Sequence, residues 1–318
     1  MRLLDALTLE FHTFTEGQVP PYLVLSRTWR EGHEVNYQDM RWLQALRLMP
    51  KESHSGYPKI LNTAQIAVEQ HIWFIWVDTV CIDKSSSSEP QEANNSMYQW
   101  YKTSHSCVVY LDDITTGSNE NMRLDSILET RWITRGWTLQ ELIAPLEAVF
   151  YDSNWEYMCS KSRSVGSLSR LLAIPEQVIA TGDTSDCCVA NIMSWAASRQ
   201  TTRVEDVAYS SLGLFDIQMP LLYGEGCKAF ERFQEAIIQR SGDDSIFAWR
   251  TAKKEPSVYR GLLAKSPEEF KAAGAAYNPY KNRKMSITNL GLRVTFNLRP
   301  LDGGDDDQLR HIRHGGYI

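Results

Sequence analysis

The 318-residue sequence lacks several patterns that would assign a function class at once. Its apolar runs stay below the roughly 20 residues that a membrane-spanning helix needs, and Asp5 interrupts the first of them. Its 33 Lys and Arg face 39 Asp and Glu with no long basic run, which disfavours a dedicated nucleic-acid binder. We therefore expect neither a membrane nor a nucleic acid as partner. Since a secretory signal is also missing, we expect a cytoplasmic protein.

Cysteine and histidine patterns for metal or nucleophilic chemistry are sparse. The six cysteines form no CxxC pair, the adjacent Cys187 and Cys188 lack a second pair at zinc spacing, and the seven histidines are scattered. We predict free thiols and no metal site. A nucleophilic Cys81 would need a base such as His105, which nothing in the sequence places beside it.

Nucleotide-binding and hydrolase loops are also missing. We find no Walker A motif and no GxSxG elbow. Gly224-Glu225-Gly226-Cys227-Lys228-Ala229 fits a dinucleotide-binding loop in its letters, but no good strand precedes it, and Glu225 would oppose a pyrophosphate. We interpret this segment as a glycine turn that leads into a helix.

Strand and helix patterns alternate in the first half of the chain. Buried strands are predicted at residues 22–26, 72–78, 107–111 and 147–151, and helices near 58–70, 88–104 and 134–144. This order predicts an α/β fold with a parallel sheet flanked by helices. Ligands of such sheets bind beyond the carboxyl ends of the strands, which here are Ser26, Asp78 and Asp112.

The second half of the sequence has mainly helical patterns. Helices are predicted at 167–172, 189–198, 204–214 and 228–240, a strand at 245–250, and a β-hairpin after Lys284. We predict three parts: an α/β core over 1–155, a helical extension over 156–250, and a C-terminal β-containing segment over 251–318. We expect the last part to be partly mobile, above all in its acidic stretch at 302–307.

One carboxylate has neighbours that could tune its acidity. In Arg135-Gly136-Trp137-Thr138-Leu139-Gln140-Glu141-Leu142, a helix would place Trp137 and Glu141 on one face. The indole would raise the carboxyl pKa, and Arg135 would oppose this increase. Spacing alone favours a solvated surface glutamate. Asp78 ends a buried strand, so its carboxylate either caps the next turn or meets a ligand.

Several ordered motifs over residues 1 to about 250 resemble the fungal heterokaryon-incompatibility (HET) domain and the extension that follows it. In the first half they are Pro20-Pro21-Tyr22-Leu23-Val24-Leu25-Ser26-Arg27-Thr28-Trp29, Trp76-Val77-Asp78-Thr79-Val80-Cys81-Ile82-Asp83-Lys84, Gln91-Glu92-Ala93-Asn94-Asn95-Ser96-Met97-Tyr98-Gln99-Trp100-Tyr101 and the segment from Arg135 to Pro145. In the extension they include Arg199-Gln200-Thr201-Thr202-Arg203 and Met219-Pro220-Leu221-Leu222-Tyr223-Gly224-Glu225-Gly226.

The resemblance implies programmed cell death after fusion of genetically different hyphae. It also implies a TIR-like fold, related to the Toll/interleukin-1 receptor domain, with a flavodoxin-like parallel sheet. Many TIR domains cleave NAD⁺ with a glutamate in a Trp-Cys-x-x-Glu-Leu motif, which residues 137–142 match with Thr138 in place of Cys. Glu141 is therefore the candidate catalytic residue of an NAD⁺ nucleosidase, with NAD⁺ as substrate and no cofactor required.

The other candidate residues would bind the dinucleotide. Trp29 or Trp137 could stack on nicotinamide or adenine, and Ser26 or Asp78 could bind ribose or water near a phosphate. Arg30 replaces a glycine of related sequences and could contact phosphate. The remaining candidates are Arg27, Cys81 and Arg135.

The sequence leaves more than one function class open. The first is an NAD⁺-consuming death effector that becomes active on self-association. The second is a non-enzymatic module that kills by oligomerising and recruiting partners, and the third is a sensor that binds nucleotide without cleaving it. Because no Walker A motif is evident, we expect activation by concentration or by an upstream receptor-like protein.

Overall fold

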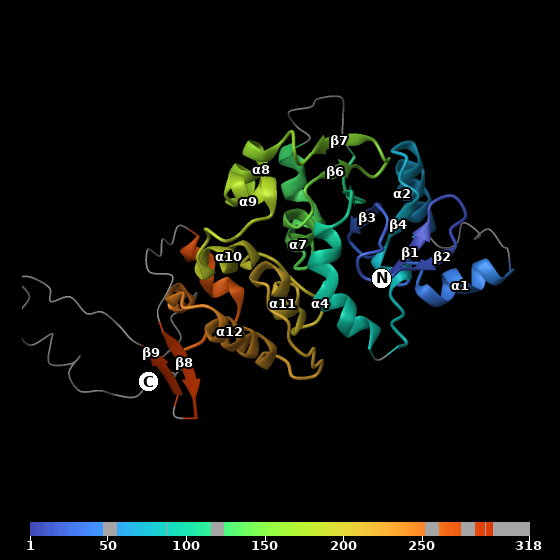
Figure 1. Ribbon diagram of the computed structural model, residues 1–318. Helices are drawn as coiled ribbons and strands as arrows, with labels where there is room; N and C mark the ends of the chain where they lie inside the picture. The colour runs from blue at the N-terminus through green and yellow to red at the C-terminus, as the bar shows by residue number, and fades with distance from the viewer. Residues whose placement is uncertain are drawn as a thin grey trace, which may run out of the picture.

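A seven-stranded sheet forms the centre of the N-terminal half in the computed structural model (Figure 1), which describes residues 1–46, 56–86, 88–115, 124–251, 261–274, 284–289 and 291–294. The strand order is β2-β1-β4-β3-β5-β6-β7. The strands are β1 (Arg2–Asp5), β2 (Phe11–Thr13), β3 (Tyr22–Arg27), β4 (Phe74–Trp76), β5 (Ser106–Tyr110), β6 (Ala148–Tyr151) and β7 (Tyr157–Ser160).

The four central strands run parallel, as predicted. β3 pairs in parallel with β4 and β5, and β5 pairs in parallel with β6. β1, β2 and β7 add antiparallel edges that the sequence analysis did not predict. The order β4-β3-β5-β6 is the 2-1-3-4 order of a doubly wound, flavodoxin-like sheet, whose ligand crevice lies where the winding reverses. Here that point lies between β3 and β5.

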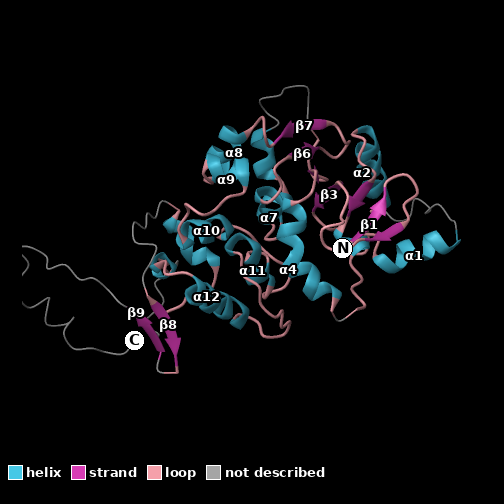
Figure 2. Cartoon of the chain, in the orientation of Figure 1, coloured by secondary structure: helices cyan, strands magenta, loops and turns pink. Residues whose placement is uncertain are grey.

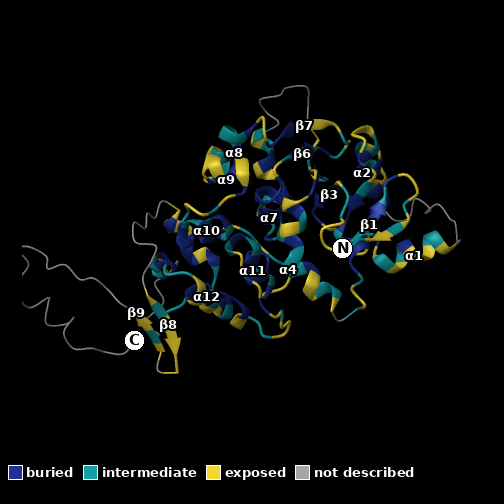
Figure 3. Cartoon of the chain, viewed as in Figure 1, coloured by how far each residue is buried: buried dark blue, intermediate teal, exposed yellow. Residues whose placement is uncertain are grey.

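Helices cover the sheet through apolar faces that the sequence pattern supplies. All six residues of β3 are buried, which fits its continuous apolar run. Helix α2 (Tyr57–Glu69) packs on β3 and β4. Helix α4 (Glu89–Lys102) places Trp100 and Tyr101 against Trp76 of β4, with ring centroids 5.5 and 5.9 Å apart. The central strands and helix α7 (Thr138–Ile143) carry the buried colour in Figure 3.

The second half is mainly helical, and its helices gather on one side of the sheet (Figure 2). Phe230, Phe233 and Ile246 belong to a hydrophobic cluster separate from that of the sheet, and Trp137 packs against both clusters. The helices are α8 (Val165–Leu172), α9 (Glu176–Thr181), α10 (Val189–Ala196), α11 (Asp206–Tyr209) and α12 (Lys228–Arg240), with 3₁₀ turns η2 (Leu212–Phe215), η3 (Asp244–Phe247) and η4 (Pro267–Ala273). Helix α1 (Tyr37–Leu46), α3 (Asp78–Cys81) and η1 (Ser126–Glu129) complete the first half.

Three predicted elements are wrong in form. The helix predicted at 134–144 is interrupted: α6 (Arg131–Thr134) ends before an extended Arg135, and α7 begins at Thr138. The helix predicted at 204–214 is split into α11 and η2. The strand predicted at 245–250 is η3, because the Asp243 carboxylate accepts the backbone N–H of Ser245 and closes a tight turn instead.

Two turn predictions are confirmed. The hairpin is formed by β8 (Met285–Thr288) and β9 (Gly291–Val294). Gly224 and Gly226 have φ of 104° and 61°, and their N–H groups donate to Glu205 at 2.8 and 3.0 Å, so this segment is a turn before α12. The acidic stretch at 302–307 and most of the predicted C-terminal segment lie outside the described residues. Among the described residues, none of the helices combines the length and apolar character needed to cross a bilayer.

Candidate functional site

The carboxyl ends of the parallel strands meet at one edge of the sheet. Arg27, at the end of β3, donates to Asp78 Oδ1 at 2.7 Å just after β4. Thr28 donates to Asp112 Oδ1 at 3.2 Å, just after β5, and Arg30 also pairs with Asp112. These contacts bring the carboxyl ends of β3, β4 and β5 together, and the expectation that a ligand binds beyond them stays a prediction.

Glu141 is buried at this edge. Only 7% of its surface is exposed, and it lies in the first turn of α7. The Ser26 hydroxyl, from β3, donates to Glu141 Oε2. The indole N–H of Trp132 donates to Ser26 Oγ at 2.7 Å, so a directed chain of donors ends on the carboxylate.

Burial makes the Glu141 carboxyl group a weaker acid than an exposed glutamate. Desolvation raises its pKa to about 7, and the nearby negative charge of Asp78 adds to this increase. The Ser26 hydrogen bond and the charges of Arg27 and Arg135 oppose it. The carboxyl group therefore changes charge near neutral pH, which is a frequent property of catalytic acids and bases.

A helix break at residues 135–136, between α6 and α7, sets the position of Glu141. The N–H of Gly136 donates to Gln200 O at 2.8 Å, and Gln200 donates back to Thr134 O at 2.6 Å. A side chain at Gly136 would lie 2.5 Å from a methyl group of Thr201, so this close approach requires glycine. Because α7 starts only after the break, Glu141 falls in its first turn and reaches β3.

Arg199 links the helical extension to the same carboxylate, and the sequence analysis did not single it out. Its guanidinium donates to Arg135 O and to Thr138 Oγ1, both at 2.9 Å. Burial lowers its pKa to about 9, and the charge of Glu141 opposes this decrease. The only sequence signal was its place in the motif 199–203.

Arg27 is enclosed in a network of ion pairs. It contacts Asp78 Oδ1 at 2.7 Å and Glu34 Oε2 at 3.0 Å, and Lys59 pairs with Glu34 at 2.6 Å. Burial alone would lower the Arg27 pKa, but the two carboxylates hold it above its ordinary value. Burial likewise fails to neutralise Asp78, since Arg27 and Lys84 keep its pKa below the ordinary value. Arg27 therefore orders the edge of the site.

Two of the predicted residues form the rim of the site. Trp29 is 38% exposed, and its indole N–H donates to Asp78 Oδ2 at 2.9 Å. The ammonium group of Lys84 lies 3.8 Å from the centre of its ring, and the guanidinium carbon of Arg135 lies 5.8 Å from it. One aromatic side chain and two cations thus lie together beside Asp78, at the carboxyl ends of the strands.

The remaining predicted residues have partners other than Glu141. Cys81 is buried in the core, its sulfur accepts the N–H of Val77 at 3.4 Å, and burial raises its pKa to about 12. Such a thiol is a poor nucleophile. Trp137 is half-buried and bonds to Asp206, and Arg30 is exposed and paired with Asp112.

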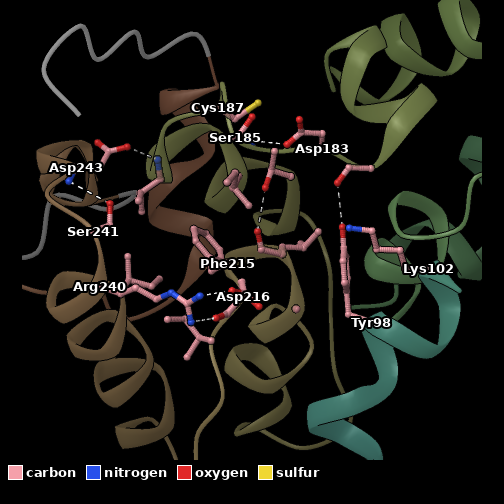
Figure 4. Close-up of a pocket in the computed structure, with 18 of the residues that line it drawn as sticks. Tyr98, Lys102, Asp183, Ser185, Cys187, Phe215, Asp216, Arg240, Ser241 and Asp243 are labelled. Carbon is pink, nitrogen blue, oxygen red and sulfur yellow. Dashed lines mark hydrogen bonds and ion pairs between the residues drawn. The ribbon is translucent and has the colours of Figure 1, made fainter. Parts of the chain in front are cut away.

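A pocket lies elsewhere in the molecule (Figure 4). A pocket of about 660 Å³ opens between α4 and the extension, where Tyr98 and Lys102 face the loop that carries Asp183. It includes none of the predicted site residues. We place the candidate site at Glu141, because a buried carboxylate with a raised pKa marks chemistry better than the size of a hollow does. Within the described residues, no cluster of His, Cys, Asp or Glu is arranged to hold a metal ion.

Comparison with known proteins identifies the class. Residues 22–124 match the family described as "Heterokaryon incompatibility protein (HET)", and residues 228–289 match a domain of unknown function, DUF8212. The chain therefore carries a HET domain, as the sequence resemblance implied.

The chain is also 40% identical over 258 residues to vegetative incompatibility protein HET-E-1 of Podospora anserina. That match covers 78% of this chain and 19% of the relative, so the chain spans about a fifth of the length of the curated relative it matches. No solved structure matches the chain, and the relation to TIR domains stays a prediction.

Proposed function

We propose that this chain acts in heterokaryon incompatibility and that it does so by hydrolysing NAD⁺ to nicotinamide and ADP-ribose. The family match and the similarity to HET-E-1 support the biological role. One observation carries the chemistry: Glu141 is buried beside Ser26 at the carboxyl edge of the parallel sheet, with its pKa raised to about 7.

The reaction needs an ionised carboxylate and does not need a proton donor. When the bond between C1′ of the ribose and nicotinamide breaks, its electron pair neutralises the pyridinium nitrogen, so no proton is required for departure. Positive charge then develops on the ribose, and an ionised Glu141 would stabilise it, as carboxylates do in glycoside hydrolysis. The oxygen of a water molecule bonds to C1′ and releases a proton. Ser26 would hold one carboxylate oxygen, leaving the other for the sugar.

Access to Glu141 is narrow, and this supports an activation step. With 7% of Glu141 exposed, a ribose would reach the carboxylate only after the side chains that cover it move. We place that movement in self-association or in binding of an upstream activator. The same burial favours the second candidate function, a non-enzymatic oligomerisation module, in which the Glu141 carboxyl group has a purely structural role.

Nicotinamide release separates the two candidates. Wild-type protein, Glu141→Gln and Glu129→Gln are incubated with NAD⁺ over a range of protein concentrations, with and without a crosslinker. Glu129 is exposed and serves as the matched control. We expect Glu141→Gln to lose about 10²- to 10³-fold in rate, because it removes a charge aimed at the transition state. If wild-type protein releases no nicotinamide in any assembled state, the oligomerisation module is the function to keep.

A further inference from the structure

Three cationic side chains gather outside the Glu141 site without an acidic partner of their own. Among the described residues, no carboxylate oxygen lies within 4 Å of the charged nitrogens of Lys84, Arg135 or Arg203. The nearby acids already have other partners. Asp78 is bound by Arg27 and Trp29, and Asp206 accepts from Tyr223 at 3.0 Å.

The cations come from three separate parts of the chain. Lys84 follows α3 and lies 3.8 Å from the Trp29 ring centre, and Arg135 lies 5.8 Å from the same ring. Arg203 belongs to the helical extension and lies 4.4 Å from the ring centre of Tyr223. Burial lowers the pKa of Lys84, the charge of Asp78 opposes this decrease, and the charges of Arg27 and Arg203 add to it, so Lys84 lies within electrostatic reach of Arg203.

Folding that brings like charges together costs free energy, which an anionic ligand would recover. We infer that Lys84 and Arg203 bind the pyrophosphate of a dinucleotide whose nicotinamide ribose lies at Glu141, with Trp29 and Arg135 between the two positions. This inference rests on the proposed function and names its substrate class. The substrate would be a pyrophosphate-bearing dinucleotide and not a nucleoside. The extension would then supply part of the binding site.

A binding experiment tests the inference independently of cleavage. ADP-ribose and inorganic pyrophosphate are titrated by calorimetry into Glu141→Gln and into the same protein carrying Lys84→Gln and Arg203→Gln. Each charge-assisted contact is worth about tenfold in affinity, so we expect a roughly 100-fold weaker Kd without both cations. Lys102→Gln with Arg170→Gln, two exposed cations outside the site, is the matched control and should leave Kd unchanged.

A kinetic series adds a second readout. In wild-type protein, kcat/KM for nicotinamide release should be highest for NAD⁺, lower for nicotinamide mononucleotide and lowest for nicotinamide riboside. The Lys84→Gln, Arg203→Gln variant should lose about 100-fold with NAD⁺ and less than threefold with the riboside.

The outcomes distinguish the two proposals. Unchanged ADP-ribose binding in the cation variant, or equal losses with NAD⁺ and the riboside, would overturn the inference. If wild-type protein cleaves no NAD⁺ but still binds ADP-ribose through Lys84 and Arg203, the hydrolysis proposal fails and the pyrophosphate site stands.

Discussion

The site at the carboxyl ends of the strands and the pocket beside α4 differ in how far their charged side chains are exposed to water. At the sheet edge, Glu141 and Arg27 are withdrawn from water and held by named partners. In the pocket, Asp216 and Arg240 pair with each other while 84% and 57% of their side chains remain exposed. Water screens this exposed ion pair, so the attraction between its charges contributes little to stability. Burial of a charged side chain shifts its pKa, whereas the volume of a cavity does not, so burial is the better indicator of a catalytic site.

The largest expected contrast between these regions is the effect of pH on stability. The folded-state pKa of Glu141 is raised from 4.5 to about 7, so the folded protein binds more protons between these values. The free energy of unfolding therefore falls as pH rises through this window, by up to about 3 kcal/mol. Glu141→Gln stays neutral, and we expect it to exceed the wild type in stability by that amount at pH 8 and to equal it at pH 4. Urea denaturation at both pH values measures this difference.

The pocket provides a control of opposite sign. Backbone and side-chain hydrogen bonds from Ser185 lower the pKa of Asp183, so its ionised form favours the fold at neutral pH. Asp183→Asn should be slightly less stable than the wild type at pH 8. If Glu141→Gln were also less stable than the wild type at pH 8, burial of the ionised Glu141 carboxylate would not destabilise the fold.

A smaller effect is expected for Ser26→Ala. The buried indole N–H of Trp132 would lose its acceptor, which costs about 1–3 kcal/mol in the free energy of unfolding. The Glu141 pKa would rise further without the Ser26 hydrogen bond, so any nicotinamide release should shift to higher pH. Thermal unfolding and a pH–rate profile measure the two effects.

The neighbouring strand offers a matched substitution. Ser106 is also a buried serine, but its hydroxyl is without a hydrogen-bond partner among the described residues. Ser106→Ala should therefore be neutral or slightly stabilising. Equal losses for the two alanine variants would contradict the role assigned to the Ser26 hydroxyl.

The smallest effect is expected for Asp216→Asn in the pocket. This substitution breaks an exposed ion pair with Arg240, and such pairs contribute about 0–1 kcal/mol. Asp216 has φ of 51°, a conformation that asparagine tolerates, so no backbone strain is added. Thermal unfolding at low and high salt should show little change. A loss larger than that of Ser26→Ala would reverse the ranking of the two regions.

The sequence predicted the parallel sheet because its strands are continuous apolar runs. Residues 22–26 and 107–111 leave no polar face, and strands of this kind belong inside a parallel sheet. The edge strands β1 and β2 escaped prediction because they are short, with four and three residues, and β2 is mostly exposed. The helix at 134–144 was wrong because residue 135 pairs with residue 200, a contact that no local pattern encodes.

The candidate site was predictable only in part, for the same reason. Ser26 and Asp78 could be placed together because parallel strands end at one edge, and Glu141 came from a family motif. Arg199 and Arg203 lie about 60 residues beyond Glu141 in sequence, and only tertiary packing brings Arg199 near Glu141 and Arg203 near Lys84. Lys84 stood in a quoted motif, but its contact with Trp29 depends on a loop conformation that propensity does not determine.

The short bridge between Arg135 and Gln200 has a consequence for how this protein can be recombined with its relatives. A chimaera that exchanged residues 1–155 alone would combine the Arg135-Gly136 segment of one protein with the Gln200 segment of another. A side chain at position 136 would meet Thr201 and Ser210, so the two segments have to fit each other and be exchanged together. The unit of exchange then has to include both segments, and residues 22–124 by themselves would carry the strand ends without the carboxylate.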